Sequence, residues 1–384
     1  MRRGRPAVSC EPLSLLSGVY GRAARFRRAW YGRYPDRTRK LEQPVISVGN
    51  LTVGGSGKTP VVAALARLLL TSGERPAILT RGYGRRRTKD GVVVVSDGHA
   101  VLVPTRESGD EPQMLARALP SVPVLVSSDR YLAGRLAERT FGCTVHLLDD
   151  GFQHVQLARD VDLLVMSADD ITERVLPWGR LRELLETASE ADALLLSDSP
   201  DVAESIGETL GITLTFRTAP RYESPRFLSG EVGSFDRGLR VVAVAGIARP
   251  ERFFAALRAE GARHDGDGRW DVVREIVFRD HHWFSRRDLA AIQQAVTDTG
   301  ADLVVTTEKD AMRLESVRHA SGGTPWAFLP HQVDVEPDQA FAAWISERLR
   351  AARDGRQQGS VRAGAPVVPA AGASLRIDDG GEAA

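Results

Sequence analysis

The chain has 384 residues, of which 26% are charged and 42% hydrophobic, and its net charge is +1. This length is enough for two domains, and the near-neutral charge gives no reason to expect a nucleic acid as partner. Two cysteines far apart, Cys10 and Cys143, indicate neither a disulfide framework nor a metal cluster and fit a reducing compartment. No apolar run approaches the ~20 residues of a membrane span, and we find no clear signal-peptide core.

Residues 1–40 are expected to form a loose leader and a basic amphipathic helix. Within 13–34, apolar residues recur at three- to four-residue steps from Leu13 to Trp30. Arginines crowd the same stretch and alternate with aromatic rings, namely Arg22, Arg25, Arg27, Arg28, Trp30, Tyr31, Arg33 and Tyr34. Such a helix is typical of a segment that lies on a membrane surface. Periodicity alone indicates a domain-capping helix with a solvated face equally well.

Residues 52–59 form the most specific motif of the chain. An apolar run at 44–48 predicts a strand before it, and an apolar run at 61–70 predicts a helix after it. This context is that of a phosphate-binding loop, whose backbone N–H groups surround an anion at a helix N-terminus. Lys58 is expected to reach the nucleotide phosphates and the Thr59 hydroxyl to bind Mg²⁺. The residues expected to bind nucleotide are Thr52, Val53, Gly54, Gly55, Ser56, Gly57, Lys58 and Thr59.

Apolar runs alternate with helical stretches from the phosphate loop to about residue 200. Strands are predicted at 77–80, 92–95, 122–126, 145–148, 161–166 and 193–196. Continuous apolar strands with intervening helices indicate a mostly parallel sheet covered on both faces. We therefore predict an α/β fold: a P-loop NTPase-like domain at 41–218 with a mostly parallel sheet.

A second, smaller α/β domain is predicted at 219–350. It has apolar strands at 241–245 and 303–307 and a helix that begins at Pro250, but no phosphate loop of its own. Residues 351–384 are rich in Gly, Ala and Arg with little periodicity, and they predict a disordered tail.

Acidic side chains follow or precede several of these elements. Asp149 and Asp150 come directly after an apolar strand, where ligands of open α/β sheets bind, although an Asp-Gly turn is the simpler alternative. Asp110 and Glu111 begin a helix, where a capping role is the simpler alternative. Glu183 lies at the nucleotide site or at the start of a surface helix.

Two further features suggest chemistry in the second domain. His281 and His282 follow Asp280, which favours acid–base work over a metal site or a helix cap before Arg286. The chain has only four lysines among 51 cationic Lys and Arg residues, Lys40, Lys58, Lys89 and Lys309. Lys309 therefore marks either a place that requires a compact ammonium group or a chance survivor.

The motifs taken together resemble the tetraacyldisaccharide 4′-kinase (lipid A 4′-kinase) family. They occur in the order of that family across roughly residues 13–345, and Thr52 in place of the usual glycine is what the family uses. The matching segments are 47–60, 80–84, 109–112, 149–154, 245–253, 278–281 and 307–310. The family pattern is broken at Ala248-Arg249, at Pro177-Trp178-Gly179 and by the long tail.

The resemblance implies transfer of the ATP γ-phosphate to the 4′-hydroxyl of a lipid disaccharide 1-phosphate, a late step of lipid A biosynthesis. It implies that Asp110 and His281 deprotonate the hydroxyl, and that Glu111, Asp149, Asp150 and Glu183 surround the nucleotide and Mg²⁺. It also implies a peripheral enzyme at the cytoplasmic face of the inner membrane, held there by the N-terminal helix. We expect a monomer.

Two other classes share the phosphate loop. Membrane-associated regulatory ATPases carry Lys directly before the two glycines, where this chain has Val53. GTPase switches carry an Asn-Lys-x-Asp motif, whereas residues 307–310 have Glu308 in the Asn position. The regulatory ATPase remains the main alternative.

Overall fold

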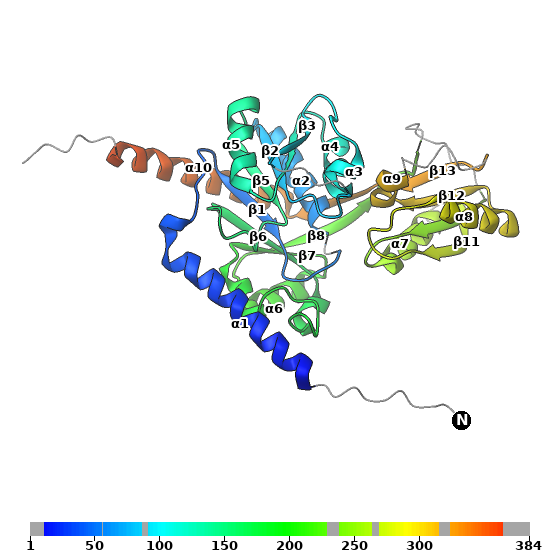
Figure 1. Cartoon of the computed structure of the whole chain (residues 1–384), viewed down its shortest axis with the longest axis horizontal. Helices are drawn as coiled ribbons and strands as arrows, with labels where there is room; N and C mark the ends of the chain where they lie inside the picture. Colours follow the sequence, from blue (N-terminus) through cyan, green and yellow to red (C-terminus); the bar gives the residue numbers. More distant parts are fainter. Residues whose placement is uncertain are drawn as a thin grey trace, which may run out of the picture.

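The computed structural model describes residues 11–55, 57–86, 91–228, 238–262, 269–314 and 323–363. They form two units, each built on its own sheet, with a long N-terminal helix α1 at the side (Figure 1). Ser56, residues 1–10 of the expected leader, and residues 364–384 of the expected tail lie outside the described residues.

The first unit is built on a nine-stranded sheet of order β14-β8-β7-β6-β1-β5-β2-β4-β3. Its seven central strands are parallel, and the edge strands β3 and β14 are antiparallel. The strands are β1 Val45–Gly49, β2 Pro76–Thr80, β3 Val93–Asp97, β4 Pro123–Val126, β5 Val145–Asp149, β6 Val161–Met166, β7 Ala193–Leu196, β8 Thr215–Tyr222 and β14 His331–Glu336. The mostly parallel sheet predicted from the apolar runs is confirmed.

Helices cover both faces of this sheet. On one face α2, α4 and α10 enclose the largest apolar core, and on the other α5 and α6 pack over separate cores. Every residue of β1 and β5 is buried, which is why these strands read as continuous apolar runs. The helices are α2 Lys58–Thr71, α3 Thr105–Ser108, α4 Asp110–Ala118, α5 Arg130–Phe141, α6 Pro200–Leu210 and α10 Asp338–Ala363, with short 3-10 turns at Pro35–Arg37, Ala168–Thr172 and Leu185–Glu190.

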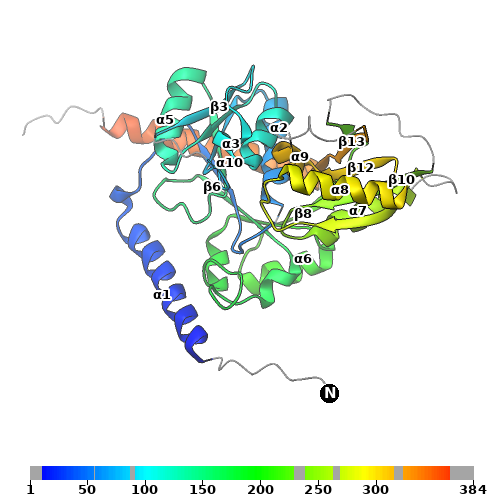
Figure 2. The same ribbon diagram turned by 45° about the vertical axis from the view of Figure 1, so that its right-hand side comes forward.

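The second unit is built on a five-stranded sheet of order β11-β10-β12-β13-β9 (Figure 2). Its strands are β9 Arg226–Phe227, β10 Leu239–Ala245, β11 Trp270–Val277, β12 Leu303–Thr307 and β13 Trp326–Leu329. Its helices are α7 Pro250–Ala262, α8 Arg286–Thr299 and α9 Glu308–Leu314. Two apolar cores lie on the two faces of this sheet, one under α7 and one under α8.

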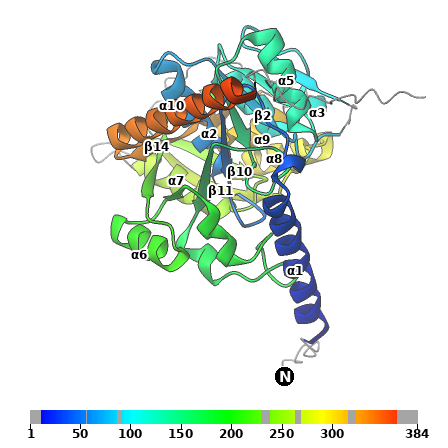
Figure 3. The same cartoon turned by 90° about the vertical axis from the view of Figure 1, so that its left-hand side faces the viewer.

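The boundaries of the second unit differ from the predicted range 219–350. The chain leaves the first sheet through β8 and returns to it through β14, which pairs with β8 from His331–Tyr222 to Glu336–Arg217. Strand β14 and helix α10 therefore belong to the first unit (Figure 3). The expectation of disorder from 351 is wrong up to Ala363, because α10 continues and its Arg353 and Arg356 pair with Glu74 and Asp160.

Helix α1, Glu11–Arg33, confirms the helix predicted at 13–34. Arg28 attaches it to the first unit: its Nη2 donates to Glu183 and to the Phe152 carbonyl, and its guanidinium lies over the Phe152 ring. Elsewhere along the helix, large apolar side chains are exposed, among them Leu16, Val19, Tyr20 and Phe26. No helix among the described residues has the length and apolar character required to cross a membrane.

Candidate active site

The phosphate loop lies between β1 and α2, as the sequence predicts. Gly54 has φ 102° and Gly57 has φ 80°, in the left-handed region that favours glycine, and Gly57 precedes the first turn of α2. The segment 180–182 fixes the start of the loop, because Val53 N–H donates to the Arg180 carbonyl (2.8 Å) and Arg182 N–H donates to the Leu51 carbonyl (2.6 Å). Leu181 in this segment forms an antiparallel β-bridge with Thr52. The segment is therefore not the start of a surface helix, which had been the alternative interpretation.

Lys58 lies across its own loop. Its Nζ donates to Asn50 Oδ1 at 2.9 Å and lies 3.3 Å from Asp150 Oδ1. Asn50 in turn donates from Nδ2 to the Thr52 carbonyl at 2.7 Å. The lysine is thereby held at the mouth of the loop, where nucleotide phosphates bind in such motifs.

Asp149 and Asp150 end β5 beside the phosphate loop but have different partners. Asp150 contacts Lys58 and accepts from Arg182 Nη1 through both oxygens, at 2.9 and 2.8 Å. Burial alone would raise the pKa of Asp150, but Lys58 and Arg182 outweigh it and lower this pKa to about 2. Asp149 accepts a bond from Thr80 (3.2 Å), and burial, with Glu111 and Asp150 nearby, raises its pKa to about 7.

The other two acidic candidates are bound to cations. Glu183 is buried and pairs with Arg28 at 2.8 Å. Glu111 accepts from Lys309 Nζ at 3.1 Å, across from the second unit. Among the described residues no three His, Cys, Asp or Glu side chains converge as a preformed metal cluster. Of the four carboxylates, Asp149 is the one for which the described chain shows no cation in contact.

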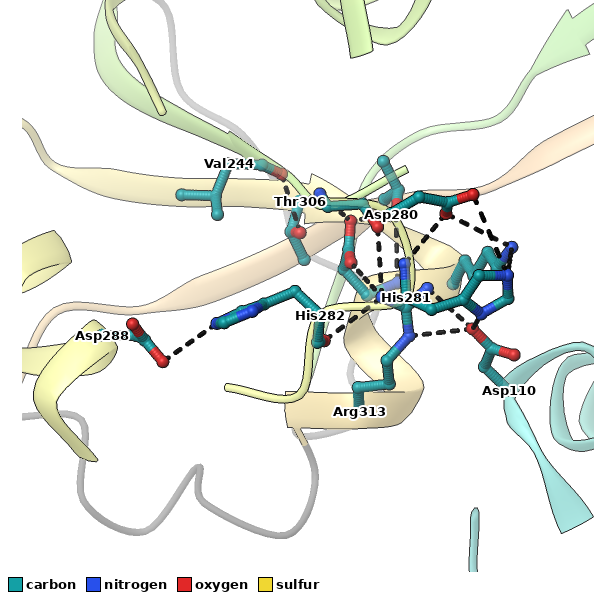
Figure 4. Close-up of polar contacts among 12 residues, drawn as sticks. Asp110, Val244, Asp280, His281, His282, Asp288, Thr306 and Arg313 are labelled. Atoms are coloured by element: carbon teal, nitrogen blue, oxygen red, sulfur yellow. Dashed lines mark hydrogen bonds and ion pairs between the residues drawn. The ribbon is translucent and has the colours of Figure 1, made fainter. Parts of the chain in front are cut away.

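Asp110 and His281 meet across the two units (Figure 4). The Nδ1 of His281, in the loop after β11, lies 3.1 Å from Oδ2 of Asp110, the first residue of α4. Arg313 of α9 donates from Nε to the same oxygen at 2.8 Å. Burial would raise the pKa of Asp110, but His281, Lys309 and Arg313 hold it well below its usual range.

One cavity of about 1680 Å³ joins these groups. The phosphate loop, Asp149 and Asp150 line it from the first unit, and His281 and Lys309 line it from the second. Asp110 lies behind this lining, with 2% of its surface exposed against 21% of the His281 side chain. The Nε2 of His281 lies 3.2 Å from Lys309 Nζ. The cavity thus places the phosphate loop of the first unit and the His281 side chain of the second on one shared space.

Known proteins match most of the chain. The family model described as tetraacyldisaccharide-1-P 4′-kinase matches residues 11–350. The chain belongs to this family. The tetraacyldisaccharide 4′-kinase of Geobacter sulfurreducens is 38% identical over 79% of this chain and 84% of its own. That of Syntrophus aciditrophicus is 34% identical over 90% of this chain and 96% of its own.

A solved member of the family has the same fold. The crystal structure of LpxK from Aquifex aeolicus in complex with ATP aligns with a TM-score of 0.67 at 31% identity, over 87% of this chain and 97% of that one. The resemblance stated from the sequence motifs is therefore confirmed, and so is the α/β fold with a phosphate-loop sheet.

Several residues of the site were not predicted from the sequence. Asn50 and Arg182 orient Lys58 and Asp150, Arg28 binds Glu183, and Arg313 binds Asp110. The sequence could mark these residues only by their nearness to a motif or to other arginines. Each one meets its partner side chain through the fold, which local patterns do not reveal. Lys309, which the scarcity of lysine had marked, does lie in the cavity.

Proposed function

We propose that this chain transfers the γ-phosphate of ATP to the 4′-hydroxyl of a tetraacyldisaccharide 1-phosphate. The observation that carries the proposal is the single cavity that holds Lys58 on one side and His281 on the other. Phosphoryl transfer requires an anchored nucleotide and an activated acceptor in line with it, more than it requires covalent chemistry. The family name and the ATP complex of the Aquifex aeolicus protein support the choice of both substrates.

Asp110 and His281 deprotonate the sugar hydroxyl as a pair. His281 lines the cavity, whereas Asp110 lies behind its ring, with Oδ2 3.1 Å from Nδ1. In this arrangement Nε2 takes the proton, and the Asp110 carboxylate orients the ring and stabilises the imidazolium that forms. Lys309 Nζ lies 3.2 Å from Nε2, so this contact has to break before Nε2 takes the proton.

Mg²⁺ fits the oxygen donors beside the phosphate loop. In such sites the ion binds one or two protein oxygens, phosphate oxygens and water, so a preformed cluster of carboxylates is not required. Thr59 and Asp149 are the ligands we propose, because Asp150, Glu111 and Glu183 are bonded to cations. The bound ion supplies charge neutralisation on the phosphates, and Asp150 holds Lys58 toward the same phosphates.

Helix α1 brings the cavity to the lipid. Its exposed side includes Leu16, Val19 and Phe26, while Tyr20, Ala23, Ala24, Arg27 and Arg28 line the cavity. A basic helix with exposed apolar side chains binds the interface of an anionic bilayer. We propose that the protein lies on the inner membrane at its cytoplasmic face, so that the acyl chains stay in the bilayer while the disaccharide enters the cavity.

A radiolabelled-ATP assay on the lipid acceptor tests the proposal. We expect label on the disaccharide with the unmodified chain, and a rate lower by about 10²- to 10⁴-fold but still measurable with Asp110→Asn. A membrane-associated regulatory ATPase would release inorganic phosphate at the same rate without the lipid. Lipid-independent turnover with no labelled lipid would overturn the kinase assignment and favour that alternative.

A further inference from the structure

Arg313 is a buried charge that the reaction as described leaves without a role. It is the largest fully buried side chain among the described residues, with 1% of its side chain exposed. Burying a guanidinium is costly unless its N–H groups are bonded and its charge is compensated. Its contacts therefore show what it is built to hold.

One edge of the guanidinium is fixed inside the second unit. Nη1 donates to the carbonyls of Gly246 (3.1 Å) and His282 (3.2 Å) and to Asp310 Oδ1 (3.2 Å). Asp310 is held in turn by Gly246 N–H at 2.8 Å and the Thr307 hydroxyl at 2.7 Å. Arg313 thus has a fixed position that needs nothing from the first unit.

The other edge reaches across to Asp110 in the first unit. Nε donates to Oδ2 at 2.8 Å and Nη2 lies 2.7 Å from the same oxygen, on which His281 Nδ1 also converges at 3.1 Å (Figure 4). Oδ1 accepts from the Glu111 N–H at 3.0 Å. A planar guanidinium fixes the direction of a carboxylate as well as its charge, which a lysine does not.

We propose that Arg313 is a positioning residue for phosphoryl transfer, which holds Oδ2 of Asp110 against Nδ1 of His281 when the two units are docked. This inference rests on the proposed function. Asp110 and His281 come from different units, so their alignment depends on how the units meet. Arg313 is fixed in the unit that carries His281, and its bonds to Oδ2 hold Asp110 in one position relative to that unit.

The test is a double-mutant cycle on the full chain with Arg313→Met, Arg313→Lys, Asp110→Asn and the Asp110→Asn/Arg313→Met double variant. The readouts are kcat, KM for ATP and Tm. The control is Arg356→Met, which removes a partly buried arginine whose two 2.7 Å contacts, to Asp160, lie outside the cavity. We expect Arg356→Met to lower Tm and leave kcat unchanged.

Arg313→Met is expected to lower kcat about 100-fold, because misplacement of a reacting group by about 1 Å has that effect. KM for ATP is expected to change less than about threefold, since the phosphate loop is untouched. Arg313→Lys is expected to recover part of the lost kcat, and the double variant to be no slower than Asp110→Asn alone.

A kcat for Arg313→Met near that of the unmodified chain would overturn the inference, and so would losses that multiply in the double variant. If Arg313→Met does not fold, Arg313→Lys carries the cycle with the same criteria. Failure of the proposed function looks different: the unmodified chain would not label the lipid, or Asp110→Asn would be fully active.

Discussion

The ammonium group of Lys58 lies 3.3 Å from Asp150 Oδ1, so the carboxylate that follows β5 orients the cation of the phosphate loop. Asp150 is itself held by Arg182, and it has φ 58°, a left-handed backbone that is uncommon outside glycine. The ion pair between Asp150 and Lys58 thus joins the end of β5 to the phosphate loop and keeps the ammonium group beside the loop.

Lys58→Met is expected to lower kcat/KM for ATP by at least about 100-fold, because it removes the cation that stabilises charge on the transferring phosphate. Lys58→Arg is expected to recover little, since a planar guanidinium does not fit a site that uses a point charge. The exposed Lys40 provides the control variant, Lys40→Met. Unchanged ATP affinity and rate in Lys58→Met would rule out the phosphate-loop assignment.

Substitutions of the neighbouring carboxylates Asp149 and Asp150 are expected to change different kinetic quantities. Asp149→Asn removes a proposed magnesium ligand and is expected to raise the Mg²⁺ concentration that gives half-maximal rate by about tenfold or more. Asp150→Asn instead removes the ion pairs with Lys58 and Arg182, so it is expected to lower kcat without raising the Mg²⁺ concentration that gives half-maximal rate. A magnesium titration of both variants checks this. The same Mg²⁺ midpoint in Asp149→Asn as in the unmodified chain would contradict the ligand assignment.

Adjacent histidines offer a matched pair. His281→Ala is expected to lower kcat about 10²- to 10⁴-fold, the range for loss of a general base, while ATP affinity measured by calorimetry stays within error. His282 points away, bonding Asp288 Oδ2 at 3.0 Å beside the Ser285 cap of α8. His282→Ala is therefore expected to lower Tm and spare kcat. Equal kinetic losses in both variants would argue against a specific role for His281.

Membrane binding is expected to depend on the exposed apolar residues of α1. The triple variant Leu16→Ser, Val19→Ser, Phe26→Ser is expected to partition about tenfold or more weakly into vesicles that contain anionic phospholipid, because apolar burial drives interfacial binding. Serines at the exposed Leu132, Val202 and Val277 form the control variant. Co-sedimentation measures both. Equal loss in the two variants would mean that binding is not specific to α1.

His331 is expected to make stability fall in weak acid. It begins β14, stacks on Tyr222, and burial lowers its pKa from 6.5 to about 4. Since the folded state binds this proton less readily than the unfolded chain, its contribution is complete above pH 6.5 and is lost as pH falls toward 4, by at most about 3 kcal/mol. Denaturant titrations at pH 7 and 4.5 should show a smaller acid loss in His331→Gln than in a control with the exposed His99→Gln. An identical loss in both would contradict the assignment.

Local patterns predicted much of this molecule. Buried parallel strands leave continuous apolar runs, which is why β1, β2, β4, β5, β6, β7, β10 and β12 were found within a residue or two. The phosphate loop is also local, since spacing and residue type determine it.

Long-range relationships were out of reach. Nothing near Arg313 in sequence indicates a bond to Asp110, 203 residues away. The return of β14 to β8 was missed because a short edge strand with polar residues resembles a loop. The continuation of α10 was missed because ion pairs from Arg353 and Arg356, and not apolar periodicity, fasten that part of the helix.

The return of the chain to the first sheet has a consequence for synthesis. Val333, Val335, Phe341, Ile345 and Leu349 close the same core that α2 begins, so the ribosome completes the whole second unit before the first can be sealed. Contacts between such distant segments form slowly and leave apolar surface open meanwhile. Termination after Arg313 but before Leu349 should therefore give an aggregating product, even though every residue proposed to act in the reaction has already been made.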